Sequence, residues 1–203
     1  MPINLFCNYI ICCPNSNLMK QSKHTVLILE TKAFFEHDKR CVFFSKESGK
    51  ITGLAKHAAR PGKKKIWSLE PLTTASVTLF QGKSFHIITH YSVNEPFQHI
   101  RTSFNHLQYA LFFIHIIKKC INEGQKNKNL FNLAINTLTL CNTLEPLDTI
   151  KSYFYKQFTY IEGIANKKEL KPENQYLIEI GNYLGYHLKP PLQLDERSKT
   201  LVK

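Results

Sequence analysis

Residues 43–65, FFSKESGKITGLAKHAARPGKKK, form the stretch around which the rest of the chain is organised. An apolar segment leads into a turn at Glu47-Ser48-Gly49, and a second segment with small side chains follows, which is the pattern of a β-hairpin. A strongly basic loop comes next. The stretch holds one acid and seven cations: Lys46, Lys50, Lys56, Arg60, Lys63, Lys64 and Lys65. This charge density is typical of a protein that binds a phosphate backbone, although runs of lysine also occur in ordinary solvated loops.

The hairpin is one part of a longer run of predicted β-strands. Short segments rich in β-branched and aromatic residues occur at 24–30, 38–45, 51–58, 72–80 and 84–93, with 31–37 as a connection. Five short strands joined mainly by hairpins are typical of a small closed or partly open β-barrel of the oligonucleotide-binding (OB) type. We therefore predict a five-stranded OB-type barrel in the N-terminal half.

The pattern changes to helical spacing after Pro96 and Phe97. Apolar residues recur at intervals of three and four over 101–123, 130–141, 147–161 and 176–188. Gly124 is the expected stop of the first helix, and Pro146 the expected start of the third. The sequence thus predicts an α+β fold, in which an OB-type β-barrel at 23–97 precedes an all-helical C-terminal domain at 98–192. Residues 1–22 are expected to be an N-terminal extension outside the fold, and 193–203 a polar tail.

Composition limits the partners and the compartment. The chain has 203 residues, of which 43% are hydrophobic, and its net charge of +12 favours a polyanionic partner: nucleic acid first, an acidic membrane surface second. Six cysteines show neither a C-x-x-C pair nor zinc-finger spacing, so free thiols in a reducing cytoplasm are predicted. The apolar residues 1–18 lack the basic start of a signal peptide, and we interpret them as an upstream extension before a second candidate start at Met19.

No catalytic constellation emerges from the sequence. The motifs of phosphate-binding loops, dinucleotide-binding turns, zinc proteases and serine hydrolases do not occur, so the chain is predicted not to be an enzyme. His86 and His90 lie at even spacing on the fifth predicted strand, so they are expected to share one face. Two histidines without a third ligand more often form a solvated face than a metal site.

Several aromatic residues are candidates for stacking on nucleic-acid bases. Phe43 and Phe44 point to opposite faces of a regular strand, so one belongs to the core and the other is a candidate platform. Further candidates are Phe34, Phe35, Trp67 and Tyr91. Each of these rings taken alone is more often a core residue.

Short motifs follow one another in a definite order: SKESGK at 45–50, AKHAAR at 55–60, LEPL at 69–72, LFNLA at 130–134 and a phenylalanine-rich segment at 154–163. Their order and spacing, over about residues 24–162, resemble the RecO family of bacterial recombination mediators. His57 and Ala59 stand where family members usually carry a glycine and an arginine. Many members also carry a four-cysteine zinc module. The corresponding residues 165–174 contain no cysteine, so we expect no zinc and no other cofactor.

The resemblance implies a function. A RecO-type protein binds single- and double-stranded DNA, anneals complementary strands in the cytoplasm, and helps RecR load RecA on DNA coated with single-strand-binding protein. The seven cations of residues 43–65 are then the DNA-binding residues. An OB-fold RNA-binding or membrane-surface adaptor with a helical partner-binding domain is the alternative. A hydrolase or nuclease would need a carboxylate cluster, and acids are sparse in the barrel half.

Overall fold

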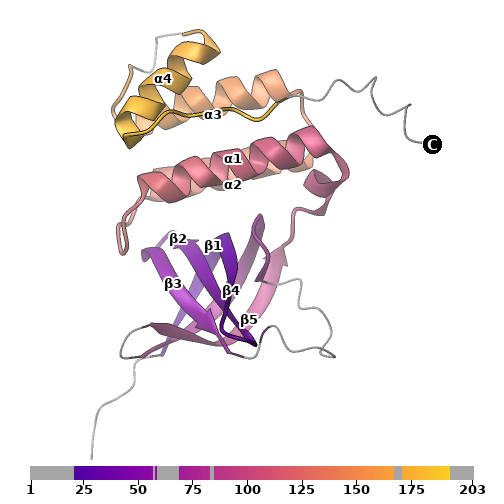
Figure 1. The fold of residues 1–203 in the computed structure, drawn as a ribbon, viewed down its shortest axis with the longest axis vertical. Coiled ribbons are helices and arrows are strands. Elements are labelled where there is room, and N and C mark those ends of the chain that lie inside the picture. Colours follow the sequence, from indigo (N-terminus) through magenta and orange to yellow (C-terminus); the bar gives the residue numbers. More distant parts are fainter. Residues whose placement is uncertain (1–20, 57, 59–68, 83–84, 167–170, 193–203) are drawn as a thin grey trace, which may run out of the picture.

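The computed structural model describes residues 21–56, 58, 69–82, 85–166 and 171–192. A β-barrel forms one end of the elongated molecule, and helices stacked in two layers form the other end (Figure 1). The strands are β1 (Gln21–Phe34), β2 (Asp38–Ser45), β3 (Gly49–Ala55), β4 (Thr73–Gln81) and β5 (His86–Glu95). The 3-10 helix η2 (Gln98–Thr102) then leads to α1 (Phe104–Cys120), α2 (Lys128–Asn142), α3 (Leu147–Ile161) and α4 (Glu173–Leu184).

The strands close into a barrel in the order β1-β2-β3-β5-β4. All neighbouring strands are antiparallel except β3 and β5, which run parallel through two residue pairs, Gly53 with His86 and Leu54 with Ile87. Alternate residues of β3 are buried, as expected for a strand with one face toward a packed interior. This closed, five-stranded connectivity is that of an OB fold, so the predicted fold class is confirmed.

Strand β1 is longer than the sequence predicts. It begins at Gln21, which pairs with Phe80 of β4, so the predicted extension 1–22 overlaps the barrel by two residues. Its other end reaches Phe34, and residues 31–34, predicted as a connection, pair with β2. A β-bulge between Ile28 and Glu30 interrupts the alternation of buried and exposed residues. Because the alternation of apolar residues is broken at the bulge, the sequence does not reveal that the strand continues to Phe34.

Helices α1 and α2 lie against the barrel, and α3 and α4 form the outer layer (Figure 1). The apolar stripes predict the helices but not all of their ends. Helix α1 stops at Cys120, before the predicted Gly124, because Ile121 is extended. Helix α4 ends at Leu184, before the predicted residue 188, because Gly185 adopts a left-handed conformation with φ 76°. Helix α3 follows Pro146, as predicted.

The buried residues form two hydrophobic clusters, one inside the barrel and one that the outer face of the barrel shares with the helices. Leu27 and Phe44 on the barrel side belong to the same cluster of buried residues as Phe113 of α1. The rings of Phe44 and Phe131 of α2 meet edge to face, with centroids 5.4 Å apart. Because this cluster crosses the boundary predicted at Phe97, the division of the chain into two domains stays a prediction.

Candidate nucleic-acid interface

Three of the seven predicted DNA-binding cations lie in the described part of the β2–β3 hairpin and its end: Lys46, Lys50 and Lys56. Lys46 and Lys50 are partly exposed beside the turn, and Lys56 is exposed just after β3. The length of β3 separates Lys50 from Lys56 by about 20 Å, at ~3.3 Å per residue. The hairpin therefore spreads these charges along its length. Arg60, Lys63, Lys64 and Lys65 lie outside the described residues.

Lys50 makes a contact between the barrel and the helices. Its ammonium group donates hydrogen bonds to the backbone carbonyls of Lys118 and Ile121, at the C-terminal end of α1. A cation is favoured there because the last carbonyls of a helix have no partner within the helix and the helix dipole is negative at this end. This lysine, predicted to bind phosphate, thus joins the two halves of the molecule.

The turn between β2 and β3 fits closely against the loop that follows α1. Gly49 adopts φ +72°, and a Cβ at this position would lie 2.1 Å from the carbonyl oxygen of Gln125. The backbone N–H of Gly124 donates a hydrogen bond to the carbonyl of Lys50 at 2.9 Å. Position 49 therefore requires glycine for two reasons: its backbone has a positive φ, and the backbone of Gln125 leaves no room for a Cβ.

An ion pair adds to this junction on strand β1. The Lys118 ammonium lies 2.8 Å from a carboxylate oxygen of Glu30, and Lys32 lies 3.1 Å from the same oxygen. Partial burial alone would raise the pKa of Glu30, but the hydrogen bonds from these two lysines lower it overall. The carboxylate therefore stays ionised and links β1 to α1.

Neither Phe43 nor Phe44 is a stacking platform, which corrects the prediction that one of them is available. Both rings are fully buried. Phe43 points into the barrel, and Phe44 points outward, where Phe131 of α2 covers it. Tyr91 packs against the barrel core and is partly buried. Trp67 lies outside the described residues.

Three phenylalanines meet at the end of the β1–β2 ribbon remote from Gly49. Phe34 and Phe35 lie at the turn between β1 and β2, with ring centroids 4.5 Å apart. The Phe34 ring also lies 6.1 Å from that of Phe85, which precedes β5. Phe35 is 82% exposed and Phe85 45%. The sequence predicts Phe34 and Phe35 as stacking candidates but not Phe85. The position of Phe85 just after the glycine turn at Gly82 could have marked it as a further candidate.

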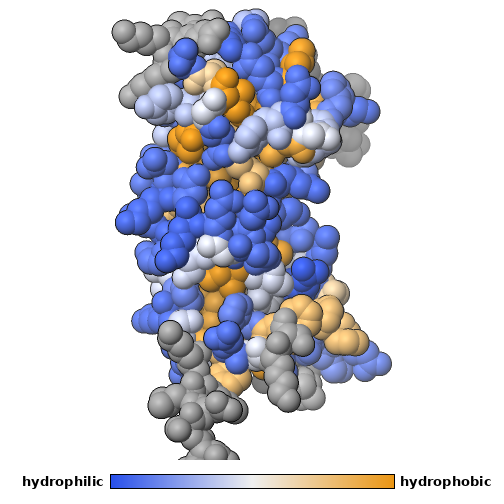
Figure 2. All heavy atoms as spheres, turned by 90° about the vertical axis from the view of Figure 1, so that its left-hand side faces the viewer, coloured by the Kyte–Doolittle hydropathy of each residue, from blue (hydrophilic) through white to orange (hydrophobic). Residues whose placement is uncertain are grey.

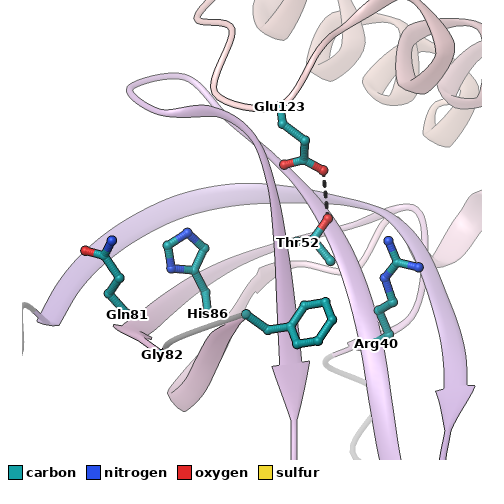
Figure 3. Close-up of a pocket in the computed structure, with 7 residues that line it drawn as sticks. Arg40, Thr52, Gln81, Gly82, His86 and Glu123 are labelled. Carbon is teal, nitrogen blue, oxygen red and sulfur yellow. Dashed lines mark hydrogen bonds between the residues drawn. The ribbon is translucent and has the colours of Figure 1, made fainter.

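A pocket of about 430 Å³ opens beside this cluster. Its lining residues are Arg40, Thr52, Gln81, Gly82, Phe85, His86 and Glu123. In Figure 3, Arg40 and His86 stand on opposite sides of the pocket, and Glu123 reaches toward it from the loop after α1. The hydroxyl of Thr52 donates a hydrogen bond to Glu123 at 2.8 Å. The pocket thus carries both a guanidinium and a carboxylate, and its charge is mixed.

His86 and His90 do not share a face of β5, contrary to the prediction for a regular strand. His86 pairs with Gln81 and His90 with Thr78, and the register shifts between these two pairs. The extra residue of this β-bulge reverses the alternation of the side chains. Within the described ranges, no three His, Cys, Asp or Glu side chains come together as a metal site. The prediction of no zinc stays a prediction.

The surface shown in Figure 2 alternates between polar and apolar regions. Hydrophilic residues form a band across the middle, and hydrophobic residues reach the surface both on the helical half above it and on the barrel half below it. Among the helices in the described part of the chain, none has the length and apolar character needed to cross a membrane.

The topology of the barrel defines an OB-fold protein. In this fold the loops between strands 1 and 2 and between strands 4 and 5 border the binding face, and the exposed phenylalanine rings lie at these two loops. Residues 19–97 match the family model described as recombination protein O N terminal. Over these residues the chain has the N-terminal domain of the RecO family.

Relatives in this family are named DNA repair protein RecO. The chain is 30% identical over 138 residues to that of Alkaliphilus metalliredigens, an alignment that covers 68% of this chain and 56% of the relative. It is 28% identical over 137 residues to that of Acetivibrio thermocellus, covering 66% and 55%. For Clostridium perfringens the identity is 31% over 118 residues, covering 58% and 48%. The matches therefore span about half the length of these relatives.

Proposed function

We propose that this protein acts in recombinational DNA repair as a DNA-binding mediator of the RecO type. The observation that carries the proposal is the match of the barrel, over residues 19–97, to the N-terminal domain of this family. The net charge of +12 supports it, because cations supply the affinity of proteins for a phosphate backbone. The names of the relatives point to the same process.

The proposed activity, annealing of complementary strands, needs no catalytic group because no covalent bond is broken. Cations that neutralise phosphates on two strands lower the repulsion between them, and the bases can then search for the paired register. The proposed phosphate contacts are Lys46, Lys56, Arg60 and the three lysines at 63–65. Lys50 is left out because its ammonium group binds the end of α1. The protein is accordingly proposed to be a mediator and not an enzyme.

The proposed partners are single- and double-stranded DNA, RecR and single-strand-binding protein in the cytoplasm, with RecA loaded indirectly. A strand-annealing assay tests this proposal. Complementary oligonucleotides coated with the cognate single-strand-binding protein should anneal faster when the protein is added. RecA filament formation on a coated strand should need both this protein and RecR. An annealing rate that stays the same at saturating protein would refute the mediator function.

A titration over salt tests the basic loop. If five of the six proposed cations contact phosphate, the slope of log affinity against log salt on a single strand is about −3.5, from about −0.7 per contact. The variant Lys63→Ala/Lys64→Ala/Lys65→Ala should bind more weakly and reduce this slope by about 2. Lys189→Ala, which removes an exposed charge after α4, is the control. Unchanged affinity and slope in the triple variant would exclude the loop from the interface.

Competitors in the same titration address the adaptor alternative. Structured RNA and vesicles of acidic phospholipid should displace a labelled DNA strand less well than unlabelled DNA of equal charge. Preferential displacement by either of them would favour an RNA-binding or membrane-surface adaptor.

A further inference from the structure

We propose that Phe34, Phe35 and Phe85 form a stacking site for unpaired nucleotide bases, through which the barrel prefers single strands to duplexes. This inference rests on the proposed function and adds to it the place where bases, in addition to phosphates, are held. The three rings come from two turns that border the binding face of an OB fold.

Phe35 combines two unfavourable features, and its ring contact with Phe34 leaves most of its side chain exposed. Its side chain is 82% exposed, and its φ of 54° lies in the left-handed region that residues with a Cβ rarely adopt. Leu72 and Phe97 also have positive φ, but they are 1% and 4% exposed, so packing holds them in place. Leu144 is about half as exposed as Phe35, at 43%. We therefore take this exposed aromatic residue in the left-handed region as a candidate contact for a ligand.

The geometry of the cluster suits planar ligands. Phe34 meets Phe35 at an interplanar angle of 72° and Phe85 at 67°, so it makes an edge-to-face contact with each of the outer rings. The outer rings are the more exposed members, and their faces are the surfaces on which bases would stack. Because every base has a π-face, such a site tolerates any sequence.

Cations flank the rings where the phosphates of a bound strand would lie. Lys32 of β1 is the strand partner of Arg40 of β2, and Phe34 is the partner of Asp38. The two pairs are two residues apart, so Lys32 lies on the same face of the sheet as Phe34, about 7 Å away along the strand. The Lys32 side chain is 68% exposed although its ammonium lies 3.1 Å from Glu30, so it can exchange this surface ion pair for a phosphate, and Arg40 is also exposed. The acid Glu36 lies in the turn and Asp38 is the first residue of β2, so the phosphates are expected farther along the strands, over Lys32 and Arg40. Stacked bases and neutralised phosphates together identify a single nucleic-acid strand as the ligand.

The site discriminates between strand types for a physical reason. Bases in a duplex are already stacked and paired, and a duplex base must be flipped out before it can reach a protein ring. Removal of the rings should therefore weaken the binding of a single strand and leave duplex affinity, which rests on phosphates, unchanged.

Fluorescence anisotropy on the full chain tests the site with three labelled ligands of equal length: a thymine strand, the same strand with abasic positions in place of bases, and a duplex. The variant Phe35→Gly/Phe85→Ala should bind the thymine strand about 5- to 150-fold more weakly, the range for one stacked base. Its affinity for the abasic strand and for the duplex should equal that of the wild type. Phe104→Ala, at an exposed phenylalanine of α1, is the matched control.

Thermal denaturation of Phe35→Gly alone checks the fold, because glycine adopts positive φ freely and the midpoint should not fall. Equal losses of affinity for all three ligands, or no loss for the thymine strand, would overturn the stacking site while leaving the proposed function in place. A wild type that binds none of the three ligands would instead refute the proposed function itself.

Discussion

Replacing Gly49 by alanine should disturb the junction of barrel and helices much more than replacing Gly124, although both glycines have φ +72°. An alanine in the left-handed region costs about 1–2 kcal/mol at either position. At Gly49 the added Cβ would also lie 2.1 Å from the oxygen and 2.4 Å from the carbon of the Gln125 carbonyl. Overpacking against backbone costs a further ~1–3 kcal/mol. At Gly124 an added Cβ meets nothing within 4 Å.

The free energy of unfolding should therefore fall by about 2–5 kcal/mol in Gly49→Ala and by about 1–2 kcal/mol in Gly124→Ala. Urea denaturation followed by far-ultraviolet circular dichroism measures both values. Because Gly124 has the same backbone conformation, the difference between the variants isolates the contact with Gln125. Equal losses in the two variants would refute the close approach of the β2–β3 turn to the loop after α1.

The remaining predictions concern the shared core, the ion pair and a buried thiol. Phe44→Ala should lower the free energy of unfolding by about 3–5 kcal/mol, because it leaves a cavity beside Phe131; a loss below about 1 kcal/mol in urea denaturation would contradict a shared core. The pKa of Glu30 is lowered from 4.5 in the folded protein, so its pair with Lys118 stabilises the fold above that pH and loses this contribution as the pH falls through the folded value. Denaturation midpoints of wild type and Lys118→Met should accordingly differ near neutral pH and converge in acid, whereas a constant difference would argue against the pair. Burial raises the pKa of the Cys41 thiol to about 11, so alkylation at this residue, followed by peptide mapping, should be slow until urea unfolds the chain; rapid labelling of the native protein would contradict its burial.

The fold is predicted well where one periodicity extends through an element. Strand β2 has the predicted bounds, because its apolar residues end at a turn that requires Gly49. Strand β1 is not predicted to its full length, since the bulge after Ile28 breaks the pattern of period two. The same cause misplaces His86 and His90, which a bulge in β5 puts on opposite faces. A single extra residue changes the direction of every side chain that follows, and nothing in the local composition marks it.

For the candidate site, the sequence predicts which residues have suitable chemistry but not how they are arranged, and their role stays a prediction. Charge identifies Lys50 as a cation of the hairpin, but the carbonyls it binds belong to α1, which is remote in the sequence. Alternation puts Phe43 and Phe44 on opposite faces without saying which face each takes, and the burial of Phe44 depends on a helix that covers the outer face. Phe85 joins Phe34 because the barrel closes and brings two turns together. Each of these outcomes depends on tertiary contacts, which local patterns do not contain.

The layered arrangement of the helices has a consequence for assembly. Helices α1 and α2 lie between the barrel and the outer pair, α3 and α4 (Figure 1). A protein that docked on the outer pair would leave the rings at the β1–β2 turn uncovered. Both ligands could then bind one molecule, and each would raise the effective concentration of the other without any contact between them.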